Sequence, residues 1–466
     1  MLEPAIHEVV RKMLVAAIGE SKVLWMKSDL LPYTKDTYRI RFEDEYKYFP
    51  DFVVLPESTP DVQNVVKIAS SKKIPLIPKG GGSNRTGMLV PIHGGIVVDT
   101  IRMNRVIEID VANLHVTVQS GITLKELGDR LAEYKLWLTQ EQGSLRMATV
   151  GGSISTSGFS RRNHKYGAIA DRVMSLEVVL ADGSILRTGP KVLYTSTGYR
   201  LLQLFISSEG TLGIITEATL RVEPIPEAQE VVLAFYSDFW TAMAAAQKLM
   251  TSGVGYSGAE TYEANDMDEL GAPKGLKALL YVMLDGTKGE VDAQADSVKR
   301  LVADTDGVLG AHDVAMSFLP RYVEQWCGAR ALTGFEDVIT SYVPMEHMRE
   351  FYDKLWNDIG PRYGIEPLPG EKFSLDAGRY KMAGGRYWLP KGELAWEKYQ
   401  KILREIAGLA TRLGGSIQGC HGVGIQHRDN LDLEYSEVAL ETMRRIKDTL
   451  DPQNIMNPGK KLPQRK

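Results

Sequence analysis

The chain has 466 residues, of which 44% are hydrophobic and 24% charged, and its formal net charge is −4. This length allows roughly two or three domains with large buried cores. The slight acidic excess argues against a dedicated nucleic-acid binder, and the lack of a long apolar run argues against a transmembrane segment. Two cysteines are too few for a disulfide framework or for an iron–sulfur cluster bound by this chain alone.

Residues 1–20, MLEPAIHEVVRKMLVAAIGE, carry acidic side chains early in the segment. This pattern predicts an amphipathic helix rather than a signal peptide, which has a basic start and an apolar middle. We therefore expect a cytoplasmic protein.

Short β-branched runs alternate with helical patterns from about residue 52 to residue 223. FVVLP and IPLIPK flank the helical TPDVQNVVKIASSKK, which predicts a βαβ-like opening. We expect further strands at GIVVD, VIEID and HVTVQSG, a capped helix at TLKELGDRLAEYK, a hairpin through Asp182 and Gly183, and a last strand pair in GIITEATLRVEPIP. The pattern predicts an α+β domain over residues 1–225.

A proline-punctuated stretch, VEPIPE at 222–227, marks the expected domain boundary. Beyond it, VVLAFY, WTAMAAAQKLM, LKALLYVML and a helical pattern at 290–304 predict an antiparallel sheet backed by helices, which we assign to a cap domain over residues 226–420. The helical LDLEYSEVALETMRRIKDTL precedes the tail LDPQNIMNPGKKL. We expect residues 421–466 to form a C-terminal segment that returns to the first domain.

The first glycine-rich segment follows a predicted strand and consists of Pro78, Lys79, Gly80, Gly81, Gly82, Ser83, Asn84, Arg85, Thr86 and Gly87. Residues that tolerate positive φ can turn successive backbone amides toward one anion, and the hydroxyl and amide side chains add donors suited to a pyrophosphate. The segment matches neither a Walker loop nor a Rossmann fingerprint. Taken alone, a structural glycine turn explains it equally well.

Two further segments have similar character. Residues 143–158, GSLRMATVGGSISTSG, offer small hydroxyl side chains where a flat ring could approach the backbone closely. Residues 208–218, SEGTLGIITEA, form another glycine turn that leads into a strand.

In this order, the segments PKGGGSNRTG, ATVGGSISTSG and SSEGTLGIITEATL, followed by GCHGVG and LDPQNIMNPGK near the end, resemble the p-cresol methylhydroxylase and vanillyl alcohol oxidase superfamily of flavoproteins. The specific likeness is to the branch that contains the flavin-binding chain of glycolate oxidase, D-lactate dehydrogenase and D-2-hydroxyglutarate dehydrogenase. The resemblance covers nearly the whole chain. It implies a two-subdomain FAD-binding domain, an antiparallel-sheet cap that faces the substrate, and a C-terminal return to the flavin.

The resemblance also implies which residues bind FAD. Residues 78–84, Thr86 and Gly87 would hold the pyrophosphate, and the ribityl chain and ring would lie along Gly143, Ser144, Thr149, Gly152, Ser153 and Ser157. Gly213 and Ile214 would lie near the adenine or pyrophosphate side, and Asn457 near the flavin edge. Covalent attachment in this superfamily commonly uses a histidine. The first segment contains none and the second region only His164, so we predict noncovalent FAD.

His421, in the glycine-flanked GCHGVG that follows a predicted strand, is the candidate catalytic base. An imidazole with a pKa near neutrality suits the removal of a hydroxyl proton while a hydride moves to flavin N5. A lone histidine is more often an ordinary hydrogen-bonded residue, and we retain that interpretation for His427.

The chain differs from the hydroxy-acid-oxidising enzymes that it resembles at the positions where those enzymes bind a divalent metal. They read Gly-Glu-His-Gly where this chain has Gly419-Cys420-His421-Gly422, and they carry an upstream histidine-rich segment where this chain has FSLDAGRYKMAGGRYWLP. A zinc site needs about three protein ligands, and only His421 is at hand. We therefore predict no catalytic metal, and we expect Cys420 to be a buried structural thiol.

Without a metal, a cationic side chain must neutralise an anionic substrate. Arginine suits carboxylates because its guanidinium group forms two parallel hydrogen bonds, although surface solvation is the usual role of any one arginine. The candidate substrate-binding residues are Arg330, Arg379, Arg386 and Tyr380.

These observations predict an FAD-dependent dehydrogenase or oxidase that takes a hydride from a hydroxylated substrate, with a 2-hydroxy acid as the leading candidate. The alternatives are an aryl alcohol or alkylphenol oxidase, a transferase similar to alkyldihydroxyacetonephosphate synthase, and a flavoprotein subunit that only relays electrons. The electron acceptor would be a quinone, an electron-transfer flavoprotein, an iron–sulfur partner or oxygen. The resemblance also suggests a homodimer.

Overall fold

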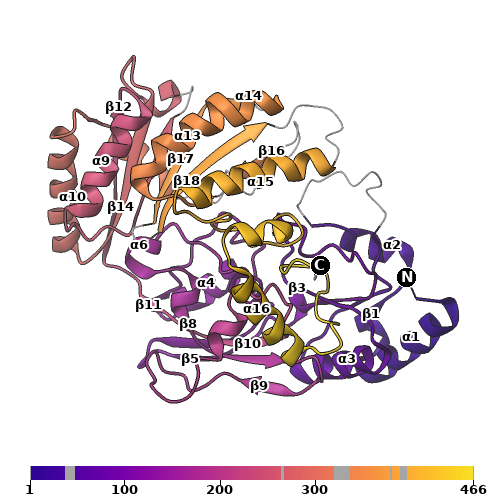
Figure 1. The fold of residues 1–466 in the computed structure, drawn as a ribbon. Helices are drawn as coiled ribbons and strands as arrows, with labels where there is room; N and C mark the ends of the chain where they lie inside the picture. The colour runs from indigo at the N-terminus through magenta and orange to yellow at the C-terminus, as the bar shows by residue number, and fades with distance from the viewer. Residues whose placement is uncertain are drawn as a thin grey trace.

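The computed structural model describes residues 2–36, 48–263, 267–319, 336–339, 341–364, 366–377, 380–388 and 396–464. Figure 1 shows a cap at the upper left, a lower part, and the yellow C-terminal helix α16 lying across the lower part. The mixed architecture and the antiparallel cap confirm the predicted fold class.

The first sheet has the strand order β1-β2-β4-β3. β2 and β3 each pair in parallel with β4, which lies between them, and β1 pairs antiparallel with β2. Helices α1 and α3 bury apolar side chains against this sheet in one core. The predicted βαβ opening is therefore confirmed, with a third strand inserted into it. The elements of this part are α1 (Pro4–Ile18), η1 (Glu20–Lys22), β1 (Val23–Leu24), α2 (Lys27–Leu30), η2 (Leu31–Tyr33), β2 (Phe52–Val54), α3 (Thr59–Lys72), β3 (Leu76–Lys79), β4 (Ile96–Asp99) and η3 (Thr100–Arg102).

The second sheet has the strand order β5-β6-β10-β8-β9, and its neighbouring strands all pair antiparallel. Helix α4 begins after Thr123, whose side chain accepts a hydrogen bond from the Glu126 amide, as the sequence pattern predicts. The elements are β5 (Val106–Asp110), β6 (His115–Gln119), α4 (Leu124–Ala132), β7 (Leu136–Trp137), α5 (Val150–Ser155), α6 (Asn163–Tyr166), α7 (Ile169–Arg172), β8 (Val173–Val179), β9 (Ile185–Arg187), α8 (Leu202–Phe205), β10 (Ile214–Arg221) and β11 (Glu223–Pro224).

One local prediction is wrong in this sheet. The final strand pair expected in GIITEATLRVEPIP does not form, because β10 pairs with β6 and β8 whereas β11 pairs with β7 in a separate sheet. The predicted hairpin through Asp182 is confirmed, since β8 pairs with β9.

The cap is a seven-stranded sheet in the order β15-β12-β14-β13-β17-β18-β16. Strand β12 is buried on both faces: Val232, Ala234 and Tyr236 join one core while Val231, Leu233 and Phe235 join another. Because successive side chains of a strand alternate in direction, this pattern requires cover on both sides of the sheet. The strands are β12 (Ala228–Tyr236), β13 (Gly258–Glu263), β14 (Ala278–Gly286), β15 (Val308–Leu309), β16 (Glu336–Ile339), β17 (Glu366–Ala377) and β18 (Tyr380–Trp388).

Helices on one face of the cap bury their apolar sides against β12 and β14 in the larger core. The helices of the cap are α9 (Phe239–Thr251), η4 (Met267–Leu270), α10 (Lys288–Ala303), α11 (His312–Met316), η6 (Met345–His347), α13 (Met348–Lys354), η7 (Leu355–Ile359), α14 (Gly360–Tyr363) and α15 (Trp396–Arg412). None of the helices in the described residues combines the length and the apolar character needed to cross a bilayer.

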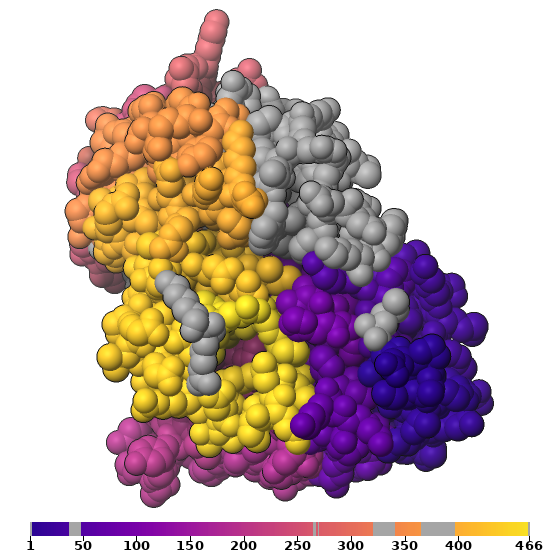
Figure 2. All heavy atoms as spheres, turned by 45° about the vertical axis from the view of Figure 1, so that its right-hand side comes forward, coloured from indigo at the N-terminus to yellow at the C-terminus, as the bar shows by residue number. Residues whose placement is uncertain are grey.

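The C-terminal segment returns to the first sheet, as the sequence predicts. After η8 (Arg428–Leu433) and α16 (Glu437–Leu450), the chain runs beside β3, where the Leu76 amide donates to Ile455 O (2.7 Å) and the Asn457 amide donates to Leu76 O (2.7 Å). Figure 2 shows these yellow residues packed between the orange cap and the magenta and indigo surface of the lower part.

Candidate active site

The first glycine-rich segment leaves the carboxyl end of β3 and is held by polar contacts. Lys79 Nζ donates to Asp99 Oδ2 (2.8 Å) at the end of the neighbouring strand β4. Asn84 Oδ1 accepts from the amide (2.8 Å) and the hydroxyl (3.0 Å) of the buried Thr86. Gly82 and Gly87 have φ values of 74° and 76°, so the turns at these positions favour glycine.

This segment packs directly on the second glycine-rich segment. A Cβ atom on Gly80 would lie 2.2 Å from Thr149 Oγ1, and one on Gly81 would lie 1.5 Å from Met147 O. Thr149 caps α5, because its side chain accepts a hydrogen bond from the Gly152 amide (3.2 Å). The two segments therefore approach more closely than any residue with a side chain allows.

His421 belongs to a turn that is attached to the same loop. Asn84 Nδ2 donates to His421 O (2.9 Å), and the Ile425 amide donates to Thr86 O (2.9 Å). A Cβ atom on Gly424 would lie 2.2 Å from Thr86 O. The strand expected before His421 is absent, since the preceding described residues form only one bridge, between Ser416 and Tyr342.

Glu209, in the third segment, holds the His421 turn from the other side. Its carboxylate is buried and accepts from the amides of Val423 (2.7 Å) and Gly424 (2.8 Å). Its own amide donates to Ser155 O (2.9 Å) at the end of α5. Glu209 has a φ of 55°, a strained conformation for a residue with a side chain, so its position is set by these contacts.

The C-terminal tail completes the assembly. Asn457 is 1% exposed, and its Nδ2 donates to Met88 O (3.1 Å) and to Glu209 O (2.8 Å). Lys460 Nζ donates to Val90 O (2.6 Å). Burial lowers the pKa of Lys460 to about 7; Arg428 acts in the same direction, while Asp36 and Glu209 oppose it. Five segments that are separate in the sequence thus meet at one place: the three glycine-rich segments, the His421 turn and the C-terminal tail.

The two histidines of the turn have lowered pKa values. Burial, followed by the nearby Arg85 and His427, lowers the pKa of His421 to about 3. Burial also lowers the pKa of His427 to about 4. Both imidazoles are therefore neutral near pH 7. His427, for which we expect only an ordinary role, is buried, and its Nδ1 has no hydrogen-bond partner among the described residues.

Buried polar atoms around the glycine-rich segments leave hydrogen-bonding capacity for a ligand. Among the described residues, Ser120 Oγ, Gln142 Nε2 and Asn457 Oδ1 are buried without a partner. A Cβ atom on Gly151 would lie 2.7 Å from Ser120 Cβ, and one on Gly158 would lie 2.0 Å from Gln142 Nε2. Because a buried polar atom without a partner costs free energy, these atoms fit a site that a polar cofactor completes.

The remaining residues predicted to bind the cofactor lie as follows. Gly143 and Ser144 precede α5, and Ser144 O accepts from the amides of Met147 (2.8 Å) and Ala148 (2.7 Å). Ser153 lies within α5, and Ser157 follows it with a φ of 52°. Gly213 immediately precedes β10, and Ile214 begins that strand beside β8 and joins the first core.

The predicted substrate residues are described only in part. Arg330 and Arg379 lie outside the described residues. Tyr380 and Arg386 lie on β18, the former opposite Ala377 of β17 and the latter opposite Val338 of β16. Their roles stay predictions.

The structure also shows the surroundings of Cys420 and His164. Cys420 is half-buried, so the expectation of a buried thiol is wrong. The His164 ring stacks on Tyr256, with a centroid distance of 3.7 Å and an interplanar angle of 18°.

Sequence reasoning missed Glu209 and Lys460 as parts of this site. Both stand inside motifs noted in the sequence, SSEGTLG and NPGKK, yet a lone acid or lysine is normally a surface residue. Their burial follows from long-range contacts with the 421–424 turn and with residues 88–90, which no local pattern encodes.

Comparisons with known proteins match this arrangement. Residues 50–189 match the FAD binding domain family, and residues 225–323 and 388–461 match the C-terminal domain of FAD linked oxidases. Glycolate oxidase subunit GlcD of Bacillus subtilis is 29% identical over 89% of this chain and 90% of its own length. A D-lactate dehydrogenase of Archaeoglobus fulgidus is 31% identical over 88% of this chain and 90% of its own length.

A solved structure extends the comparison to the fold. p-Cresol methylhydroxylase with substrate bound superposes with a TM-score of 0.82 at 18% identity, covering 99% of this chain and 97% of that one. At this identity the likeness concerns the fold alone.

Proposed function

The chain belongs to the family of FAD-linked oxidases, and from this membership we propose that it dehydrogenates a 2-hydroxy acid, with His421 as the base. The membership confirms the resemblance drawn from the sequence, and with it an FAD-dependent oxidoreductase. The proposed substrate class rests on the names of two relatives, a glycolate oxidase subunit and a D-lactate dehydrogenase, because glycolate and D-lactate are both 2-hydroxy acids.

The residues that would hold FAD are those of the converging segments. Residues 78–84, Thr86 and Gly87 would bind the pyrophosphate, and Thr149, Gly152 and Ser153 would lie along the rest of the cofactor. When bound, FAD supplies a hydride acceptor at its isoalloxazine ring. Ser120 Oγ, Gln142 Nε2 and Asn457 Oδ1 are buried polar atoms that such a cofactor could satisfy.

The observation that carries the proposal is the hydrogen bond from Asn84 to His421 O (2.9 Å). It ties the backbone of the candidate base to the candidate pyrophosphate loop, and the Glu209 carboxylate fixes the same turn from the opposite side. A base must be held within hydrogen-bonding reach of the proton it removes, and the hydrogen bonds from Asn84 and to Glu209 restrain the backbone of this turn.

The protonation state of His421 also suits the role. Because desolvation keeps its pKa low, the imidazole is neutral near pH 7 and has a lone pair for the hydroxyl proton. The low pKa also makes it a weaker proton acceptor than the near-neutral imidazole that the sequence predicts. The electrons would then leave the reduced cofactor for an external acceptor, which on the family's pattern is a quinone, an electron-transfer flavoprotein, an iron–sulfur partner or oxygen.

Anaerobic mixing of the purified flavoprotein with a panel of substrates tests the proposal. We expect one enantiomer of a 2-hydroxy acid, such as lactate or 2-hydroxyglutarate, or the achiral glycolate, to bleach the visible flavin band. Bleaching by aryl alcohols alone would indicate an alcohol or alkylphenol oxidase. Reduction only by a partner protein would indicate an electron relay.

The mode of FAD attachment is tested on the same preparation. We expect denaturation to release FAD into the supernatant. The first glycine-rich segment has no histidine that could form a covalent bond to the flavin, and His164, the one histidine of the second region, packs its ring on Tyr256. A yellow polypeptide after denaturation would contradict noncovalent binding.

A further inference from the structure

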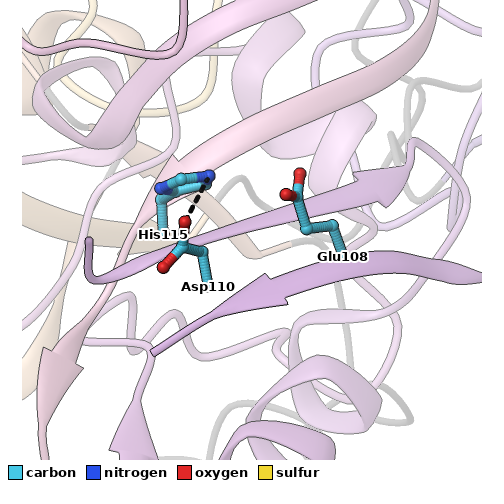
Figure 3. A group of neighbouring side chains, drawn as sticks. All are labelled: Glu108, Asp110 and His115. Atoms are coloured by element: carbon cyan, nitrogen blue, oxygen red, sulfur yellow. Dashed lines mark ion pairs between the residues drawn. The ribbon is translucent and has the colours of Figure 1, made fainter. Parts of the chain in front are cut away.

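A cluster of three side chains stands on the β5–β6 hairpin, away from the candidate active site. Glu108 and Asp110 are two residues apart on β5, so they share a face of the strand. His115 begins β6 and is the cross-strand partner of Asp110. Figure 3 shows the two carboxylates and the imidazole projecting to the same side of the hairpin.

The three groups are close enough to share one ion. Each offers one ligand atom, and these atoms all lie within 4.8 Å of one another. His115 Nε2 is 4.0 Å from Asp110 Oδ2. Ligand atoms around a tetrahedral zinc ion are roughly 3.4 Å apart, so the widest separation would have to shrink by at most about 1.4 Å to close the site. Glu108 is exposed and can turn to supply it.

His115 is the observation that points to a ligand. It is 5% exposed, and neither ring nitrogen has a hydrogen-bond partner among the described residues. A buried polar group without a partner is costly, and this imidazole is directed at two carboxylates that are too far away to accept its proton. A bound cation would satisfy all three groups together.

The neighbouring groups set the charge of the cluster. Asp110 is positioned by Asn113, whose amide and Nδ2 donate to its two oxygens (2.8 Å each), and hydrogen bonds from Asn113 lower the pKa of Asp110. Lys191 pairs with Glu108 and lowers the pKa of that carboxyl. On β10, Arg221 is the cross-strand partner of His115, but its guanidinium pairs with Glu223 (3.0 Å). Both carboxylates are therefore ionised.

We propose that Glu108, Asp110 and His115 bind a divalent transition-metal ion of the zinc type, with water completing the coordination. One imidazole and two carboxylates suit zinc better than calcium or magnesium, which prefer oxygen ligands alone. The expectation of no metal rests on the ligands around His421 alone, whereas the new site lies at the opposite end of β6 from Ser120, which borders Gly151 near the cofactor segments. The proposed ion therefore lies apart from the candidate active site.

Calorimetric titration of the chelator-treated, FAD-loaded chain with zinc chloride tests the site. We expect saturation at one ion per chain. His115→Gln should weaken binding by at least about 100-fold, because even second-shell changes typically cost 10–100-fold. His312→Gln is the matched control, since His312 pairs with Glu230 (3.2 Å) on the exposed surface of the cap, and its Kd should equal that of the wild type.

A second variant separates binding from misfolding. Lys191→Met removes the cation that competes for Glu108, so it should tighten zinc binding. The ligand-field bands of cobalt(II), added in place of zinc, should appear in the wild type and disappear in His115→Gln, with flavin content unchanged in both. Equal zinc affinity in His115→Gln and the wild type, or in Lys191→Met and the wild type, would overturn the three-ligand site.

Discussion

At the scale of single residues, the environment of His421 decides which form of the base is present. Burial is the largest cause of its lowered pKa, and the positive charge of Arg85 acts in the same direction. An exposed histidine has a pKa near 6.5 and would be partly protonated at neutral pH. Here the neutral imidazole persists well into the acid range, so the base needs no prior deprotonation.

The pH dependence of flavin reduction follows from this shift. A base acts only when neutral, so the rate falls as the pH drops through its pKa. With that pKa lowered to about 3, we expect the second-order rate constant of anaerobic reduction to stay flat from about pH 8 down to about pH 5. The measurement is stopped-flow reduction across this range, and an acid limb centred near pH 6.5 would contradict the lowered pKa of His421.

Glu209 is the residue on which the His421 turn depends. Glu209→Gln keeps the size of the side chain but places an NH₂ group against one of the two amides it now accepts from. We expect the free energy of unfolding to fall by about 1–3 kcal/mol. Urea denaturation measures it, with Glu437→Gln as the control because Glu437 is 78% exposed and its ion pair with Arg444 is worth little. Equal losses in the two variants would remove Glu209 from this role.

At the scale of secondary-structure elements, the sequence predicts the scaffold better than the site. The strands β2, β3 and β14 and the helices α3 and α4 follow from hydrophobic periodicity and caps, such as Ser58 accepting from the Asp61 amide at the start of α3. The sequence does not predict helix α5, because Val150–Ser155 is rich in glycine and serine, which favour loops. It forms because Thr149 caps it and because its glycines allow close packing.

The packing of residues 80–82 on the segment before α5 gives an element-scale prediction. Gly81→Ala places a Cβ atom 1.5 Å from Met147 O, so backbone must shift. We expect a loss of about 1–3 kcal/mol in unfolding free energy, together with a lower flavin content per chain.

Gly128→Ala is the matched control for that substitution. Gly128 lies inside α4, and a methyl group added there would have no atom within 4 Å, so it should stabilise the helix by about 0.5–1 kcal/mol. Urea denaturation and the ratio of flavin to protein absorbance compare the pair. Full flavin content and unchanged stability in Gly81→Ala would refute the close packing of the two segments.

At the scale of the whole molecule, the cap is joined to the lower part by a buried charge cluster. Asp285 of β14 has no side-chain exposure; it accepts from Arg162 (2.7 Å) and Lys165 (2.8 Å), and from the Tyr166 hydroxyl. Burial alone would raise the pKa of Asp285, but the hydrogen bonds from Lys165 and Tyr166 and the charge of Arg162 outweigh it and lower the pKa. The sequence also predicts domain limits at residues 225 and 420 and a homodimer, and these stay predictions.

This cluster makes the joint sensitive to acid. Since the folded pKa of Asp285 lies below its usual value of 3.8, the ionised group stabilises the folded state above that value, and the contribution disappears as the pH falls through the folded pKa. We expect Asp285→Asn to cost about 1.5–3 kcal/mol at neutral pH, because it removes the ionic hydrogen bonds to Arg162 and Lys165, although Arg162 keeps its ion pair with Glu141 (2.9 Å) and Lys165 is partly exposed. Unfolding measured from neutral to acidic pH should show the wild type and the variant converging, and a pH-independent difference would contradict this cause.

The molecule as a whole brings five separate segments of sequence to one place, and the central claim is that they hold FAD beside a histidine base. The most direct test is the anaerobic rate of flavin reduction by the best 2-hydroxy acid, compared between the wild type and His421→Gln at equal flavin content. We expect the substitution to slow reduction by roughly 10²-fold or more. Equal rates in the two proteins would show that His421 is not the base.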